Sequence, residues 1–201
     1  MNSKYLLTLV AALTWPLTAS PAQVTVQVVS ANDKPLANAA VYLDSAEARA
    51  AVQPLKRVEI TQEQRRFVPT LTVIPLGSRV HFPNLDNVRH HVYSFSPAKP
   101  FELRLYAGTP ADPVVFDKPG IAVLGCNIHD AMVAWVVVVE TPYYGRTDAD
   151  GRLTLPQVPA GTYRLRAWHA DLPAGSPISD EALQVGPTPA AVRVRLNTTV
   201  K

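Results

Sequence analysis

Three side chains that carry sulfur or imidazole donors recur at three-residue steps in the second half of the chain. They are Cys126, His129 and Met132, within the segment GCNIHDAM. A thiolate and a thioether favour copper, and imidazole also suits this metal. One Cys and two His in a trigonal plane, with a distant axial Met, form the donor set of a one-copper site. A loop of this length does not surround an ion by itself, so a second imidazole must come from another strand.

Two adjacent histidines, His90 and His91, are candidates for that imidazole. They follow the polar loop NLDNVR and begin an extended segment. Neighbouring side chains in a strand point to opposite faces, so at most one of the two faces the same ion. Their positions alone do not choose between them.

Short extended segments separated by turn residues predict an all-β protein. Val24, Val26 and Val28 alternate with polar residues, which is typical of a half-buried strand. The run AWVVVVE ending at Glu140 predicts a strand buried on both faces. The Asp-Gly pair within residues 147–152 is a strong hairpin signal. Other expected strands span residues 39–43, 58–60, 71–74, 79–82, 92–95, 101–105, 113–116, 163–167 and 192–196, and residues 45–51 form a short helix or a loop.

The chain from Val58 to Val139 resembles the cupredoxins, the family of plastocyanin, amicyanin and azurin. The likeness lies in QRRFVPTLTVIPLGSRVHF, in FDKPG and in the Cys-x2-His-x2-Met spacing of amicyanin-like members. In this family the first His follows an Asn-x-Asp loop and precedes a small or polar residue and Val, which selects His90. The resemblance implies a Greek-key β-sandwich with one copper ion bound by His90, Cys126, His129 and Met132.

Two features depart from the cupredoxin pattern. The strand before Cys126 carries aromatic residues in that family, but here it reads IAVLG. His91 follows the first ligand, where Asn, Thr or Ser is common. Groups around the ligands tune the reduction potential of a bound metal, so these changes alter the expected potential. They do not remove a ligand. The strings HHVYSFSPAKPFEL and LGCNIHD are similar to exported methylamine-utilisation-type cupredoxin proteins.

The flanking segments DKPLANAAVYL and TDADGRLTLPQVPAGTYRLRAW resemble a carboxypeptidase-regulatory-like, transthyretin-like β-sandwich. Such strands normally lie close in sequence. We therefore expect residues 23–50 and 144–201 to form one small sandwich, with a cupredoxin domain of residues 51–143 inserted in a surface loop. Two sandwiches in series, with the N-terminal strands joining the copper domain, are the alternative.

The N-terminus predicts export. Residues 1–4 supply a positive start, residues 5–17 an apolar run, and Ser20-Pro21-Ala22 a cleavage site, so residues 1–22 read as a signal peptide and predict a periplasmic protein. The apolar run is too short to span a membrane, and no later segment has the roughly 20 apolar residues that a span needs. Cys126 is the only cysteine and forms no internal disulfide.

Charge and motifs narrow the expected function. The net charge is only +3, and the Lys and Arg residues are scattered without a long basic tract. Nucleic-acid binding is therefore not expected. A fully ligated copper lacks the open position that metal catalysis needs, so we expect no enzyme. The leading hypothesis is an electron carrier whose redox partner docks near the copper. A copper chaperone or store is the first alternative, and a β-sandwich binding module without metal is the second.

Overall fold

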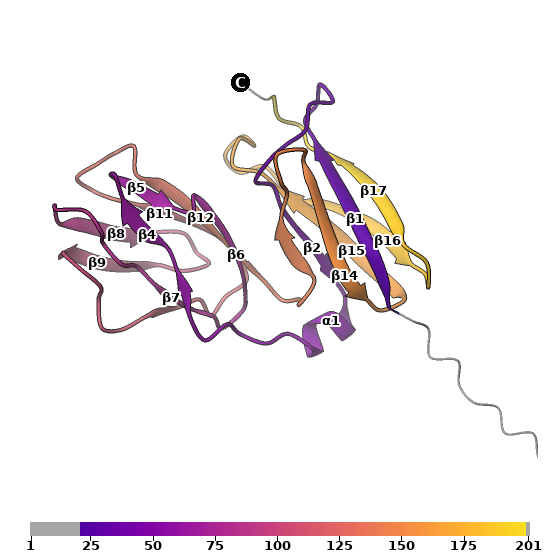
Figure 1. Cartoon of the computed structure of the whole chain (residues 1–201), viewed down its shortest axis with the longest axis horizontal. Helices are drawn as coiled ribbons and strands as arrows, with labels where there is room; N and C mark the ends of the chain where they lie inside the picture. The colour runs from indigo at the N-terminus through magenta and orange to yellow at the C-terminus, as the bar shows by residue number, and fades with distance from the viewer. Residues whose placement is uncertain (1–20, 200–201) are drawn as a thin grey trace, which may run out of the picture.

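The computed structural model describes residues 21–199, and strands dominate this range (Figure 1). The only helix among these residues is α1 (Ala46–Ala50), which Ser45 caps by accepting a hydrogen bond from the Ala48 N–H. No helix in the described part of the chain is long and apolar enough to cross a membrane. The predicted all-β class is confirmed.

Two sheets form what we call the flanking sandwich. Their facing sides enclose a core of aliphatic residues that includes Val26, Leu43 and Leu165, each almost completely buried. One sheet has the order β14 (Arg152–Val158), β1 (Ala22–Val29) and β17 (Ala190–Arg195). The other has the order β13 (Tyr144–Arg146), β2 (Ala40–Asp44), β15 (Gly161–Trp168) and β16 (Ser179–Val185).

Residues 58–139 form the central sandwich. Its core contains Phe82, Phe116 and Val136, and Cys126 and Met132 belong to the same cluster. The main sheet has the order β6 (Leu71–Pro75), β12 (Val133–Val139), β11 (Gly120–Gly125), β8 (His90–Ser94) and β9 (Phe101–Tyr106). The smaller sheets are β10 (Val114–Val115), β7 (Arg79–His81) and β3 (Val58–Glu59), and the hairpin of β4 (Thr61–Glu63) and β5 (Arg66–Val68).

Strand pairing joins the two ends of the chain. β1 pairs antiparallel with β14 and parallel with β17, and β2 pairs with β13 and β15. Among the described residues, no strand of 22–44 belongs to a sheet with a strand of 58–139. The strands at the two ends of the chain thus pair with one another and not with the central sandwich. The inserted arrangement and its serial alternative stay predictions. The exact domain boundaries stay a prediction.

The two sandwiches meet through an apolar cluster. Trp135 of β12 and Trp168 of β15 lie with ring centroids 6.3 Å apart, and Tyr42 and Val137 are buried beside them. The Arg146 guanidinium also donates a hydrogen bond of 3.0 Å to the Leu71 carbonyl. Figure 1 shows the two bodies side by side, with α1 below their junction.

One expectation about a turn was wrong. The Asp-Gly turn after β13 does reverse the chain, and the Asp148 carboxylate accepts hydrogen bonds from the Asp150 and Arg152 N–H groups. However, β13 pairs with β2 and β14 pairs with β1, so the turn links two sheets and does not close a hairpin. The hairpin β4–β5 and strand β16 were not among the expected strands.

Candidate metal centre

Three predicted ligands meet in the central sandwich. His90 begins β8, Cys126 follows the last residue of β11, and His129 lies in the loop before β12. Their donor atoms all lie within 4.8 Å of one another, and Cys126 Sγ is 3.9 Å from Nδ1 of each histidine. For comparison, a metal bond of about 2.3 Å to sulfur and one of about 2.1 Å to nitrogen, at a trigonal angle, place the two donors about 3.8 Å apart. The spacing therefore suits one ion between the three atoms.

Backbone turns explain why the donors recur at three-residue steps. The His129 N–H donates to the Cys126 carbonyl at 3.4 Å, and the Met132 N–H donates to the His129 carbonyl at 2.9 Å. Each turn brings the next donor residue back beside the previous one. Met132 is only 1% exposed and packs in the same core cluster as Cys126.

The structure separates the rival histidines. His90 is completely buried and belongs to the donor cluster, but His91 does not. His91 Nε2 lies 3.1 Å from a Glu102 carboxylate oxygen, without the alignment of a hydrogen bond, and the His91 ring packs edge-on against Tyr93. The alternation of strand side chains thus directs only one of the adjacent rings toward Cys126.

Asp86 holds the far side of the His90 ring. Its Oδ2 lies 2.7 Å from His90 Nε2, while Nδ1 of the same ring faces Cys126. A ligating histidine typically donates its other ring N–H to a carboxylate or carbonyl, which fixes the tautomer and the ring orientation. Our sequence analysis missed this role of Asp86. The signal was a carboxylate four residues before His90 in the quoted loop.

Hydrogen bonds keep the Asp86 carboxyl ionised. Partial burial raises its pKa, but the N–H groups of Arg65 and Gln64 and the His90 ring together hold that pKa below its ordinary value. The carboxylate accepts from Gln64 N at 2.7 Å and from Arg65 N at 2.9 Å. An ionised acceptor therefore faces His90.

Asn84 fixes the loop that carries Asp86. Its side-chain amide donates to the Val88 carbonyl at 2.8 Å and to the Tyr106 carbonyl at 3.0 Å. Its Oδ1 accepts from the Asp86 N–H at 3.0 Å. Asn84 is 4% exposed, so these are shielded hydrogen bonds that define the path of the loop.

The loops around the donor cluster expose apolar side chains. Leu85 and Val88 lie on the loop before His90, and Ile128 lies on the ligand loop beside His129. Their exposed fractions are 61%, 41% and 47%. His129 itself is half-buried, whereas Cys126 and His90 are buried.

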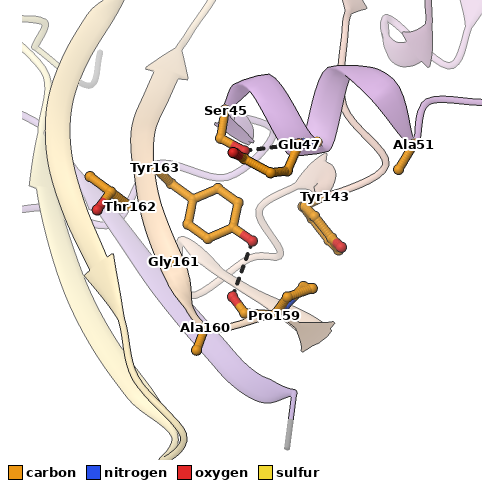
Figure 2. Close-up of a pocket in the computed structure, with 10 residues that line it drawn as sticks. Ser45, Glu47, Ala51, Tyr143, Pro159, Ala160, Gly161, Thr162 and Tyr163 are labelled. Atoms are coloured by element: carbon orange, nitrogen blue, oxygen red, sulfur yellow. Dashed lines mark hydrogen bonds between the residues drawn. The ribbon is translucent and has the colours of Figure 1, made fainter. Parts of the chain in front are cut away.

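A cavity of about 510 Å³ lies elsewhere, in the flanking sandwich (Figure 2). Glu47 and Ala51 of the α1 region form one side, and Tyr143 and Tyr163 contribute rings that meet edge-to-face. The Tyr163 hydroxyl donates to the Pro159 carbonyl at 3.0 Å. His90, Cys126 and His129 are the only cluster of three such potential ligands in residues 21–199, so this cavity holds no comparable donor set.

Comparisons with known proteins give structural likenesses at low identity. No family model and no curated protein matches the chain. A copper-containing nitrite reductase from Thermus scotoductus SA-01 is 24% identical over 56% of this chain and 28% of that chain, with a TM-score of 0.39. Amicyanin from Paracoccus versutus is 19% identical over 49% of this chain and 97% of that chain, with a TM-score of 0.36.

A purple cupredoxin from Nitrosopumilus maritimus is 22% identical over 42% of this chain and 99% of that chain, with a TM-score of 0.35. This chain thus spans little more than a quarter of the nitrite reductase chain that it matches. What the fold and site define here is an all-β protein with a Cys–His–His donor cluster in which Cys126 and His90 are buried.

Proposed function

We propose that the protein binds one copper ion through His90, Cys126 and His129, with Met132 as a weak axial ligand, and that it carries electrons. The observation behind this is a buried thiol 3.9 Å from two imidazole nitrogens that come from separate parts of the chain. Cys126 is 3% exposed and has no disulfide partner among the described residues. A soft thiolate with two imidazoles suits copper, and Met132, which carries a thioether, belongs to the same core cluster as Cys126.

Copper in this position would supply a one-electron couple between Cu(I) and Cu(II). The residues of this chain would keep the donor geometry constant in both oxidation states. His90 lies in a strand and is fixed by Asp86, and Cys126 follows a strand that pairs with β12 over its whole length. Four protein ligands leave no open position for a substrate, so we propose a carrier and not an enzyme.

The apolar rim formed by Leu85, Val88 and Ile128 is where we propose that a redox partner docks. These exposed side chains lie on the two loops that carry His90 and His129. Large exposed apolar patches mark interaction sites, and these three side chains are the candidates for such a patch here. His129, as the half-buried ligand, would be the donor closest to a partner docked there.

We propose a periplasmic location from the signal peptide predicted at residues 1–22. Residues 1–20 lie outside the described part of the chain. A methylamine-utilisation role stays an inference from the resemblance of HHVYSFSPAKPFEL and LGCNIHD to that group of proteins.

The test is to express residues 23–201, add Cu(II), and record visible and electron paramagnetic resonance spectra. A carrier gives an intense thiolate-to-copper absorption band that disappears on reduction and returns on oxidation. Cys126→Ser abolishes the band, while His169→Ala leaves it unchanged, because His169 bonds to the Ala37 carbonyl in the flanking sandwich.

Two other results would redirect the assignment. A protein that retains Cu(I), shows no reversible cycle and passes copper to an acceptor is a chaperone or store. A colourless protein whose properties are the same in Cys126→Ser would support a binding module without metal.

A further inference from the structure

We propose that the β4–β5 hairpin is a positioning element for the copper ligand His90 and acts through Asp86. This inference rests on the proposed copper site. It assigns a role to residues 61–68, which supply no ligand themselves.

The turn of the hairpin has an unusual backbone. Gln64 and Arg65 have φ angles of 54° and 57°, in the left-handed region that side chains other than Gly, Asn and Asp rarely adopt. Two-residue hairpins with two positive φ angles normally use Asn-Gly or a similar pair. Here both N–H groups of the turn bond to the single carboxylate of Asp86. Strained backbone persists where the surrounding structure enforces it, and it clusters at functional sites.

The hairpin is also fixed to the loop before His90 by backbone hydrogen bonds. The Gln62 N–H donates to the Pro83 carbonyl at 2.8 Å, and the Leu85 N–H donates to the Gln62 carbonyl at 2.9 Å. The Gln62 side chain is completely buried and donates to the Phe82 carbonyl at 3.2 Å. The turn is therefore held in place relative to Asp86.

These contacts form a continuous chain from the hairpin turn to the donor atom. The turn N–H groups orient the Asp86 carboxylate, the carboxylate accepts the Nε2–H of His90, and Nδ1 of the same ring faces Cys126. An acceptor at Nε2 leaves Nδ1 free of a proton and able to bind a metal. The negative charge beside the ring also stabilises Cu(II) relative to Cu(I), which lowers the reduction potential.

The first variant is Asp86→Asn, which preserves shape and removes the charge. We expect the visible band to persist, copper affinity to fall by roughly 10- to 100-fold, and the reduction potential to rise. Asp117→Asn is the matched control, because Asp117 is an exposed carboxylate of the same sandwich that pairs with Lys99 at 3.0 Å. A coloured Asp86→Asn protein with wild-type affinity and potential would overturn the proposal.

The second variant tests the turn. In Arg65→Gly the N–H group is retained and a positive φ is unstrained, so affinity and potential should stay at wild-type values. Arg65→Pro lacks the N–H, and its fixed φ excludes the observed conformation. We expect this variant to show weaker copper binding and a higher potential in the same direction as Asp86→Asn. If Arg65→Pro is folded and has wild-type copper properties, the turn has no positioning role.

A measurement on the copper-free protein separates this proposal from the proposed function. The Nε2–H proton of His90 should give a slowly exchanging NMR signal in the wild type and in Arg65→Gly. It should exchange faster in Asp86→Asn and in Arg65→Pro. A wild-type protein without the visible band but with this pattern would refute the copper carrier and support the hairpin contact. If the wild type shows the visible band but the His90 proton exchanges at the same rate in the wild type and all three variants, the copper carrier is supported and the hairpin contact is refuted.

Discussion

The ring of Tyr93 occupies the space where a side chain of Gly125 would stand. A Cβ atom added to Gly125 would lie 2.8 Å from both Cζ and Oη of Tyr93. The two residues face each other across β8 and β11, and Gly125 is bonded to Cys126. The strand IAVLG carries no aromatic residue, but the neighbouring strand places a ring against its last position. A side chain at position 125 would therefore displace the Tyr93 ring.

Gly125→Ala should displace the Tyr93 ring next to the proposed ligand. Because Tyr93 must move, we expect the free energy of unfolding to fall by about 1–3 kcal/mol, the usual effect of overpacking. Urea unfolding of the copper-free protein measures this. The double variant Gly125→Ala with Tyr93→Leu should recover part of the loss, since the shorter side chain vacates the site. Equal stability of Gly125→Ala and wild type would contradict the contact.

His90→Ala and His91→Ala should have opposite effects on copper binding. His90 belongs to the donor cluster, so its removal should abolish the intense visible band. His91 faces Glu102 and Tyr93, so its removal should leave the band and the copper stoichiometry unchanged. Spectra at increasing Cu(II) concentration distinguish the two variants. A band lost in His91→Ala and kept in His90→Ala would reverse the ligand assignment.

Met132→Leu should retain copper and raise the reduction potential. The thioether is the weak axial donor of the proposed site, and its loss removes electron density that favours Cu(II). Met132 is buried, but Leu has a similar volume, so the free energy of unfolding should fall by less than about 1.5 kcal/mol. Ile74→Leu, a similar change in the same core, is the control and should leave the potential unchanged. Voltammetry of both variants provides the comparison.

Tyr106 should make stability depend on pH in the alkaline range. Burial raises the pKa of Tyr106 to about 12 from 10.0, although the hydrogen bond from Gln62 opposes this shift. Below pH 10 the stabilising contribution is complete. It falls as the pH rises toward about 12, because the unfolded tyrosine loses its proton first.

The variant Tyr106→Phe tests this dependence in the copper-free protein. It loses the hydrogen bond to the Phe82 carbonyl, so it should be less stable than wild type near neutral pH by about 1 kcal/mol. The difference should narrow as the pH rises through the window above 10. Urea titrations at several pH values would show a constant difference if Tyr106 keeps an ordinary pKa.

Local patterns in the sequence were sufficient to place the donor residues. His129 meets Cys126 because a backbone turn returns the chain after three residues, and a second turn leads to Met132. Strand alternation limits the site to one of His90 and His91, and the resemblance of the preceding loop to the cupredoxin pattern selected His90. Both relations depend on short stretches of backbone, which a sequence pattern describes directly.

Relations between distant segments were not predictable in the same way. Gln64 and Arg65 carry none of the usual signals of a tight turn, so their contact with Asp86 appears only in the fold. The Asp-Gly turn before Arg152 indicates a reversal but not the partner of each strand. β14 pairs with β1 and β13 pairs with β2, so the turn between β13 and β14 links two different sheets.

The parallel pairing of β1 with β17 has a consequence for the order of folding. Val24 is the partner of Ala190, so the sheet that contains β1 is complete only when β17, far along the chain, has joined it. Residues 58–139 contain all the partners of their own sheets and are translated in between. Because long-range pairing is slow, residues 58–139 should form the Cys–His–His pocket while β1 still has an unpaired edge. Truncation before Ala190 would leave that edge permanently open to other chains.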